Sequence, residues 1–274
     1  MNQNEIMNNY QLKVKLASVI VIAFQLLMLS AELLYQYVIV PFYGYHYWVS
    51  RLIFSIIFTL FIVFLLKSFD IKLKNRIDKP KGKEVGLVAI IAIFSIVTFL
   101  IFVFPVVYIN SVFSLQGNVH LSGNNYTYHQ NLQYVIFGCV IAPILEEIFW
   151  RELLLSRLIQ NYNPTKVILI LSFVFGVLHF KSSFLGLILL SIIASYIYIK
   201  SNSLVLAIVY HSLWNFFDLF FSFFREQLCD VLISLWYIPI FFIGAVSIWL
   251  LLMKFATFQE GNKNFNISKK DISH

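Results

Sequence analysis

Two adjacent carboxylates, Glu146 and Glu147, lie in the middle of the apolar stretch Ile141–Arg151. A charged carboxylate at the centre of a membrane helix costs about 2.5–3.5 kcal/mol on insertion scales, so an adjacent pair indicates a function rather than passive packing. Glu147 and Arg151 are four residues apart and share one helix face, which suits an ion pair. Glu146 points about 100° away and is left available as a catalytic acid or base. The alternative is a buried ion-pair network that locks two helices together.

Two later apolar segments carry the other groups that could take part in chemistry. His179 ends the sequence Phe175-Gly-Val-Leu-His179 and is flanked by apolar residues. Taken alone, such a histidine is more typical of a hydrogen-bonded core residue than of a base. His211 and Asn215 are four residues apart, so both project from one helix face and can reach the same small volume. Hydrogen bonding between membrane helices would explain that pair equally well.

The composition predicts that these groups are held by membrane helices. The chain is 60% hydrophobic and 12% charged, with a mean hydropathy of +0.81, which a soluble surface could not accommodate without large apolar patches. We therefore expect an all-α, polytopic membrane protein that forms a single integral membrane domain over residues 1–274. Windows of about 20 apolar residues predict eight transmembrane helices, near 16–39, 48–66, 85–108, 132–159, 166–181, 184–200, 203–224 and 232–254.

Charge placement predicts the orientation of these helices, because cytoplasmic loops carry an excess of Lys and Arg. The connection from Lys67 to Lys83 holds seven such residues, whereas residues 110–133 hold none. We expect both termini in the cytoplasm, a basic cytoplasmic tail over 255–274, and the cell (cytoplasmic) membrane as the location. Glu32 and Asp218 are further intramembrane acids to which the sequence assigns no role.

The spacing along the chain places the candidate residues at one depth. Glu146 and His179 stand 17 and 16 residues from Asn163 on opposite arms of a helical hairpin, so at about 1.5 Å per residue they reach nearly the same height. His211 and Asn215 lie roughly 12–18 Å into their helix from the same side. We therefore predict one intramembrane active site in the inner half of the bilayer.

The motifs carry a family resemblance. Glu-Glu-x-x-x-Arg at 146–151, Phe-x-x-x-His at 175–179 and His-x-x-x-Asn at 211–215 occur in this order, each on its own hydrophobic helix. This set resembles the CPBP family of intramembrane proteases, which includes the CAAX prenyl endopeptidases and the bacterial Abi proteins. The resemblance covers roughly residues 130–220, which we take as the catalytic core.

The resemblance implies a CAAX-type endopeptidase of the metalloendopeptidase class. Glu146 and His179 would activate a water molecule for attack on a peptide carbonyl, and His211 and Asn215 would stabilise the oxyanion. Glu146, His179 and His211 could also bind a divalent metal such as zinc, with water as the fourth ligand. The same residues suffice without a tightly bound metal, and the sequence does not choose between these mechanisms.

The implied substrate is a membrane-embedded or lipid-anchored peptide or protein, with a role in peptide maturation or bacteriocin immunity. Glu147 and Arg151 would support the site by holding their helix in register. No nucleic-acid partner is expected, because no basic face is interleaved with aromatic residues. The alternative is a non-catalytic membrane scaffold that binds a sensor kinase or transporter. A solute carrier is disfavoured, because the chain shows no inverted repeat.

Overall fold

The computed structural model describes residues 47–68, 80–113, 132, 134–179, 184–222 and 237–272, and all regular elements in these ranges are helices. This confirms the all-α class. The chain divides into two compact units. The first comprises Met1–Asn75 and Ile144–Ile192, and the second comprises Arg76–Pro143 and Ile193–His274. The single domain over 1–274 stays a prediction.

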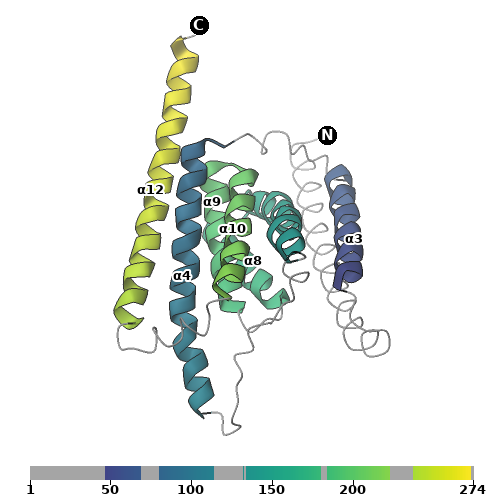
Figure 1. The fold of residues 1–274 in the computed structure, drawn as a ribbon. Helices are drawn as coiled ribbons and strands as arrows, with labels where there is room; N and C mark the ends of the chain where they lie inside the picture. Colours follow the sequence, from purple (N-terminus) through teal and green to yellow (C-terminus); the bar gives the residue numbers. More distant parts are fainter. Residues whose placement is uncertain are drawn as a thin grey trace. The chain divides into compact units, whose positions relative to one another are not determined.

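The helices follow the apolar stretches of the sequence (Figure 1). Their bounds are α3 Tyr47–Ser68, α4 Gly82–Phe113, η3 Tyr134–Ile141, α6 Ala142–Glu147, η4 Ile148–Leu155, α7 Ser156–Leu158, α8 Pro164–Leu178, α9 Phe184–Ser201, α10 Leu204–Ser222 and α12 Tyr237–Ile272. The expected helix at 16–39, with Glu32, lies outside the described residues. The last helix was expected to end near 254 but continues to Ile272; no proline follows the apolar stretch to end it.

The chain is a multi-pass membrane protein. Among the described residues, four helical segments are long and apolar enough to cross a bilayer: Gly82–Ile101, Phe184–Ser201, Leu204–Phe221 and Phe242–Gln259. Two shorter apolar helices are Ser55–Ser68, within α3, and α8. The count of eight spans and the cytoplasmic location of both termini stay predictions.

The helix that carries the adjacent carboxylates is π-helical on both sides of α6. η3 and η4 contain eight residues each, which is long for a geometry that usually appears as single turns near functional sites. Pro143 stands at the second position of α6. A proline in a helix interior lacks the N–H for the usual bond and its ring crowds the carbonyl of residue i−4. A wider turn before Pro143 relieves that crowding, so the proline accounts for the π geometry of η3.

Local capping fixes the ends of the helices that follow. Asn163 caps α8 by accepting a hydrogen bond from the Lys166 backbone N–H at 3.2 Å, and Pro164 occupies the first helical position, where no N–H is needed. α9 ends at Ser201 and is followed by Asn202, whose φ of 57° is the left-handed conformation that asparagine tolerates. The Ser203 hydroxyl then accepts from Leu206 N–H and starts α10. α9 and α10 therefore form a tight helical hairpin.

In the second unit, α4 packs against α10 and runs antiparallel to α12 (Figure 1). Near the start of α4, the buried Glu84 carboxylate accepts a hydrogen bond from Gln259 on α12 at 3.0 Å. Halfway along α4, Thr98 lies against Gly244, where an added Cβ would collide with the threonine side chain. The glycine therefore permits the close approach of the two helices.

This contact predicts opposite effects for two glycine-to-alanine substitutions. Gly244→Ala should lower the free energy of unfolding by about 1–3 kcal/mol, because the β-branched Thr98 side chain is stiff and cannot readily make room. Gly86 lies on α4, and a Cβ added there would meet nothing within 4 Å. Gly86→Ala should therefore stabilise the protein by about 0.5–1 kcal/mol, because alanine has the higher helix propensity. Thermal unfolding in detergent measures both. A stabilised Gly244→Ala variant would contradict the close contact.

Candidate active site

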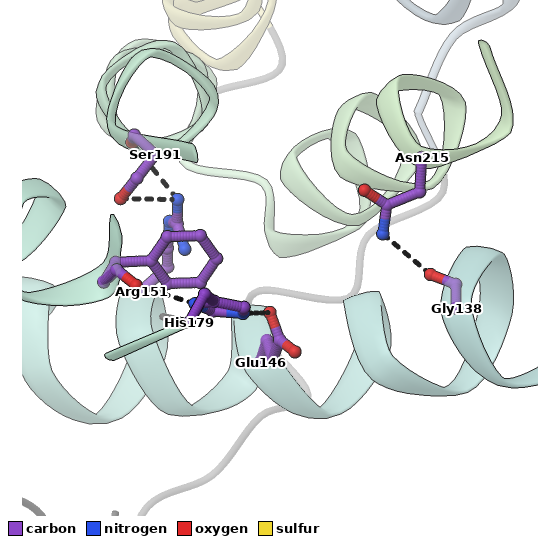
Figure 2. Close-up of polar contacts among 7 residues, drawn as sticks. Gly138, Glu146, Arg151, His179, Ser191 and Asn215 are labelled. Atoms are coloured by element: carbon purple, nitrogen blue, oxygen red, sulfur yellow. Dashed lines mark hydrogen bonds and ion pairs between the residues drawn. The ribbon is translucent and has the colours of Figure 1, made fainter. Parts of the chain in front are cut away.

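A buried ion pair lies at the centre of the first unit. Arg151 Nε is 2.9 Å from Glu147 Oε2, and the two side chains are 1% and 0% exposed. The same guanidinium donates from Nη2 to the Ser191 carbonyl at 3.1 Å and to the Ser191 hydroxyl at 3.3 Å (Figure 2). The predicted pairing of Glu147 with Arg151 is therefore present, and it ties η4 to α9.

The neighbouring carboxylate has a different environment. Glu146 Oε2 faces His179 Nε2 at 3.8 Å, and the two side chains are 20% and 27% exposed (Figure 2). Glu146 belongs to α6, and His179 is the residue that caps the C-terminal end of α8. The two are more than thirty residues apart in the chain. The structure therefore brings this predicted pair together and leaves it accessible, while Glu147 is sealed.

The orientation of the imidazole fixes the chemistry of its two nitrogens. His179 Nδ1 is 2.7 Å from the carbonyl oxygen of Phe175. A carbonyl oxygen only accepts, so Nδ1 carries the proton, and in its neutral form the ring presents the lone pair of Nε2 toward Glu146. Hydrogen bonding at one ring nitrogen thus makes the other nitrogen a base.

The distance between Glu146 and His179 suits a shared donor. At 3.8 Å the facing oxygen and nitrogen are beyond hydrogen-bond range, and an ionised carboxylate and an unprotonated Nε2 are both acceptors. A molecule with two O–H donors, such as water, can bridge two acceptors over this type of gap. The pair can therefore hold and polarise a water molecule.

In the second unit, the side-chain amide of Asn215 donates to the Gly138 carbonyl at 2.7 Å (Figure 2). In a π-helix the carbonyl of each residue accepts a hydrogen bond from the N–H five residues later. For Gly138 that residue is Pro143, which has no N–H. Asn215 on α10 thus donates to a carbonyl whose π-helical partner would be a proline. An amide nitrogen has two hydrogens, so one remains for a ligand. His211 lies one turn earlier on α10 and is 2% exposed.

Each predicted residue is thus placed within its own unit. Glu146 faces His179 in the first unit, while His211 and Asn215 lie on α10 in the second. The convergence of the two pairs on one pocket stays a prediction. Asp218 follows Asn215 on the same face of α10, is half-buried, and keeps no assigned role.

A zinc site needs at least three protein ligands. The described part of the chain gathers no group of three or more His, Cys, Asp or Glu residues that could hold a metal ion. Glu146 and His179 supply two ligands, so the predicted zinc site depends on His211 joining them. The first unit alone does not fit the metal.

Two contributing residues were missed by the motif analysis. Ser191 binds Arg151 and Gly138 binds Asn215, and neither belongs to the three motifs. Ser191 had a signal, because a serine inside an apolar helix often hydrogen-bonds to a neighbouring helix. Gly138 binds through its carbonyl, which every residue has, so only the position of Pro143 could have pointed to it.

Comparison with protein-family models matches residues 128–217 to the family described as Type II CAAX prenyl endopeptidase Rce1-like. The match confirms the protease family inferred from the motifs and covers all three of them. It leaves the first three expected helices and the C-terminal helix unmatched. No curated protein and no solved structure matches the chain.

The buried ion pair predicts a specific pattern of stability. Arg151→Met keeps side-chain volume but leaves Glu147 as an uncompensated buried acid, which should cost about 3–5 kcal/mol. The double variant Glu147→Leu/Arg151→Met removes both charges and should recover part of that loss. Unfolding in detergent compares the two. If the double variant were less stable than Arg151→Met alone, the charge-compensation argument would be wrong.

Proposed function

From its Type II CAAX prenyl endopeptidase Rce1-like domain, we propose that the chain is an intramembrane endopeptidase in which Glu146 and His179 activate water. The observation that supports this most directly is the accessible Glu146–His179 pair at 3.8 Å. The Glu147–Arg151 pair, by contrast, is sealed from solvent. The proposed substrate is a membrane-embedded or lipid-anchored peptide or protein.

In the proposed reaction, one water molecule donates to Glu146 Oε2 and His179 Nε2. Its oxygen attacks the peptide carbonyl carbon while Glu146 takes a proton. The Phe175 carbonyl holds the Nδ1 proton of His179 and so keeps Nε2 directed at the water. Collapse of the tetrahedral intermediate breaks the C–N bond as Glu146 returns its proton to the leaving nitrogen.

Oxyanion stabilisation is assigned to α10 in this proposal. Asn215 retains one amide hydrogen beyond the bond to Gly138, and His211 lies four residues earlier on the same face. An amide already anchored by its second hydrogen is preorganised, which is the property that makes an oxyanion donor effective. The loss of such a donor typically costs about 10²–10³ in kcat.

Glu146→Gln should abolish cleavage while leaving the protein folded and inserted, because an amide cannot accept the proton of the water. Quantitative proteomics of membrane peptides from cells that carry wild type or the variant tests catalysis and identifies substrates together. Glu152→Gln is a matched control, since it makes the same chemical change six residues along the chain at an acid that is buried rather than accessible. Full activity of Glu146→Gln would refute the assignment. Unchanged peptides in every strain would favour a non-catalytic scaffold.

Metal dependence follows from the ligand count. Glu146 and His179 supply two ligands and a zinc site needs three, so without His211 as a ligand cleavage by purified protein should continue after exhaustive chelation. Metal analysis by mass spectrometry, combined with activity before and after chelation, is the measurement. Loss of activity that zinc restores, together with zinc bound by wild type and absent from purified His211→Ala, would contradict this expectation and identify His211 as a third ligand.

A further inference from the structure

We infer that Ser191 on α9 is a positioning residue for the His179 imidazole, acting through Arg151 and Phe175. The inference rests on the proposed function and extends it to a helix that none of the three motifs includes. Four contacts connect Ser191 to the candidate base, and all of them lie in the first unit.

The first contact fixes the guanidinium. Ser191 is 2% exposed and offers Arg151 two acceptors, its carbonyl and its hydroxyl, at 3.1 and 3.3 Å. Glu147 holds Nε of the same group at 2.9 Å. Arg151 is therefore held from two sides, so the plane of its guanidinium has a defined orientation.

The second contact carries this orientation to α8. The central carbon of the Arg151 guanidinium lies 5.6 Å from the centroid of the Phe175 ring, within the range of a cation–π interaction. Phe175 is fully buried, and Trp150 meets its ring edge-on at 5.6 Å. Guanidinium and indole together hold the phenyl ring in one rotamer.

The third and fourth contacts reach the imidazole. The rings of Phe175 and His179 lie 4.4 Å apart between centroids, at 46° to each other. The Phe175 carbonyl also takes the Nδ1 proton of His179. One residue thus supports both the plane of the imidazole and its tautomer, so a shift of Phe175 would turn Nε2 away from Glu146.

Close packing of the two helices supports this arrangement. Gly176 follows Phe175, and a Cβ there would lie 2.5 Å from Ile188 Cγ1 and 2.9 Å from the Phe184 carbonyl oxygen. α8 and α9 therefore meet within one turn of Ser191 with no room for adjustment. Such contact transmits a change at Ser191 to α8 rather than absorbing it.

The test uses variants of Ser191 with a matched control. Ser191→Ala should lower kcat about tenfold, the loss expected for one hydrogen bond to a charged group, with KM nearly unchanged because substrate contacts remain. Ser191→Thr restores the hydroxyl and should restore most of kcat. Ser195→Ala removes an equally buried serine one turn along α9 and should leave kcat unchanged.

A second pair of variants examines the aromatic step. Phe175→Leu keeps an apolar side chain but removes the ring between Arg151 and His179, and should lower kcat at least as much as Ser191→Ala. Phe173→Leu makes the same change on α8 at a ring that is 57% exposed and should have no effect. Melting curves of all variants show whether a loss of kcat accompanies a loss of fold.

A spectroscopic readout separates this inference from the proposed function. With ¹⁵N-labelled histidine, the wild-type His179 signal, identified by its absence in His179→Asn, should show a proton on Nδ1. Ser191→Ala and Phe175→Leu should shift that signal toward a mixture of tautomers, whereas Ser195→Ala should not. An unchanged tautomer and kcat in folded Ser191→Ala would overturn the inference even if wild type cleaves peptides. Absence of cleavage by wild type, with the tautomer shift present, would instead overturn the proposed function.

Discussion

The first unit depends on the burial of one guanidinium. Removing a charge from water costs several kcal/mol even after relaxation, and this cost is offset only when good geometry satisfies the group. Arg151 Nε and Nη2 meet a carboxylate and a serine, and the guanidinium lies over an aromatic face; these partners come from three helices of the unit. Any displacement of η4, α8 or α9 would leave part of the charge unsatisfied, so the guanidinium sets where these helices lie.

Two adjacent glutamates can have different roles because the helix turns their side chains into different surroundings. Glu147 is enclosed with Arg151, while Glu146 is partly exposed opposite an imidazole. A sealed carboxylate supports the fold beside its partner, whereas an accessible one can exchange protons with a ligand. Because the two residues are adjacent, the sealed Glu147 lies directly beside Glu146, the proposed catalytic carboxylate.

The helix of the two glutamates also shows how an irregular backbone is accommodated among apolar helices. Backbone groups in a membrane must be satisfied within the protein, because lipid offers no hydrogen bonds. Pro143 removes one donor, and the Asn215 amide supplies another at Gly138. Asn215, which is expected to stabilise the oxyanion, thus also donates a hydrogen bond to the backbone at Gly138. That bond would hold its second amide hydrogen in place.

The sequence alone determined the membrane class, the helical stretches from 48 onward, the protease family and the pairing of Glu147 with Arg151. These follow from composition and from spacing within one helix, which are local properties. The tertiary structure decided the meeting of Glu146 with His179, the bond from Nδ1 to the Phe175 carbonyl, and the use of Ser191 and Gly138 as acceptors. These contacts join residues whose partners depend on helix rotation and on the rotamers of buried side chains. Neither is encoded by spacing along the chain, because both are set only when helices pack against each other.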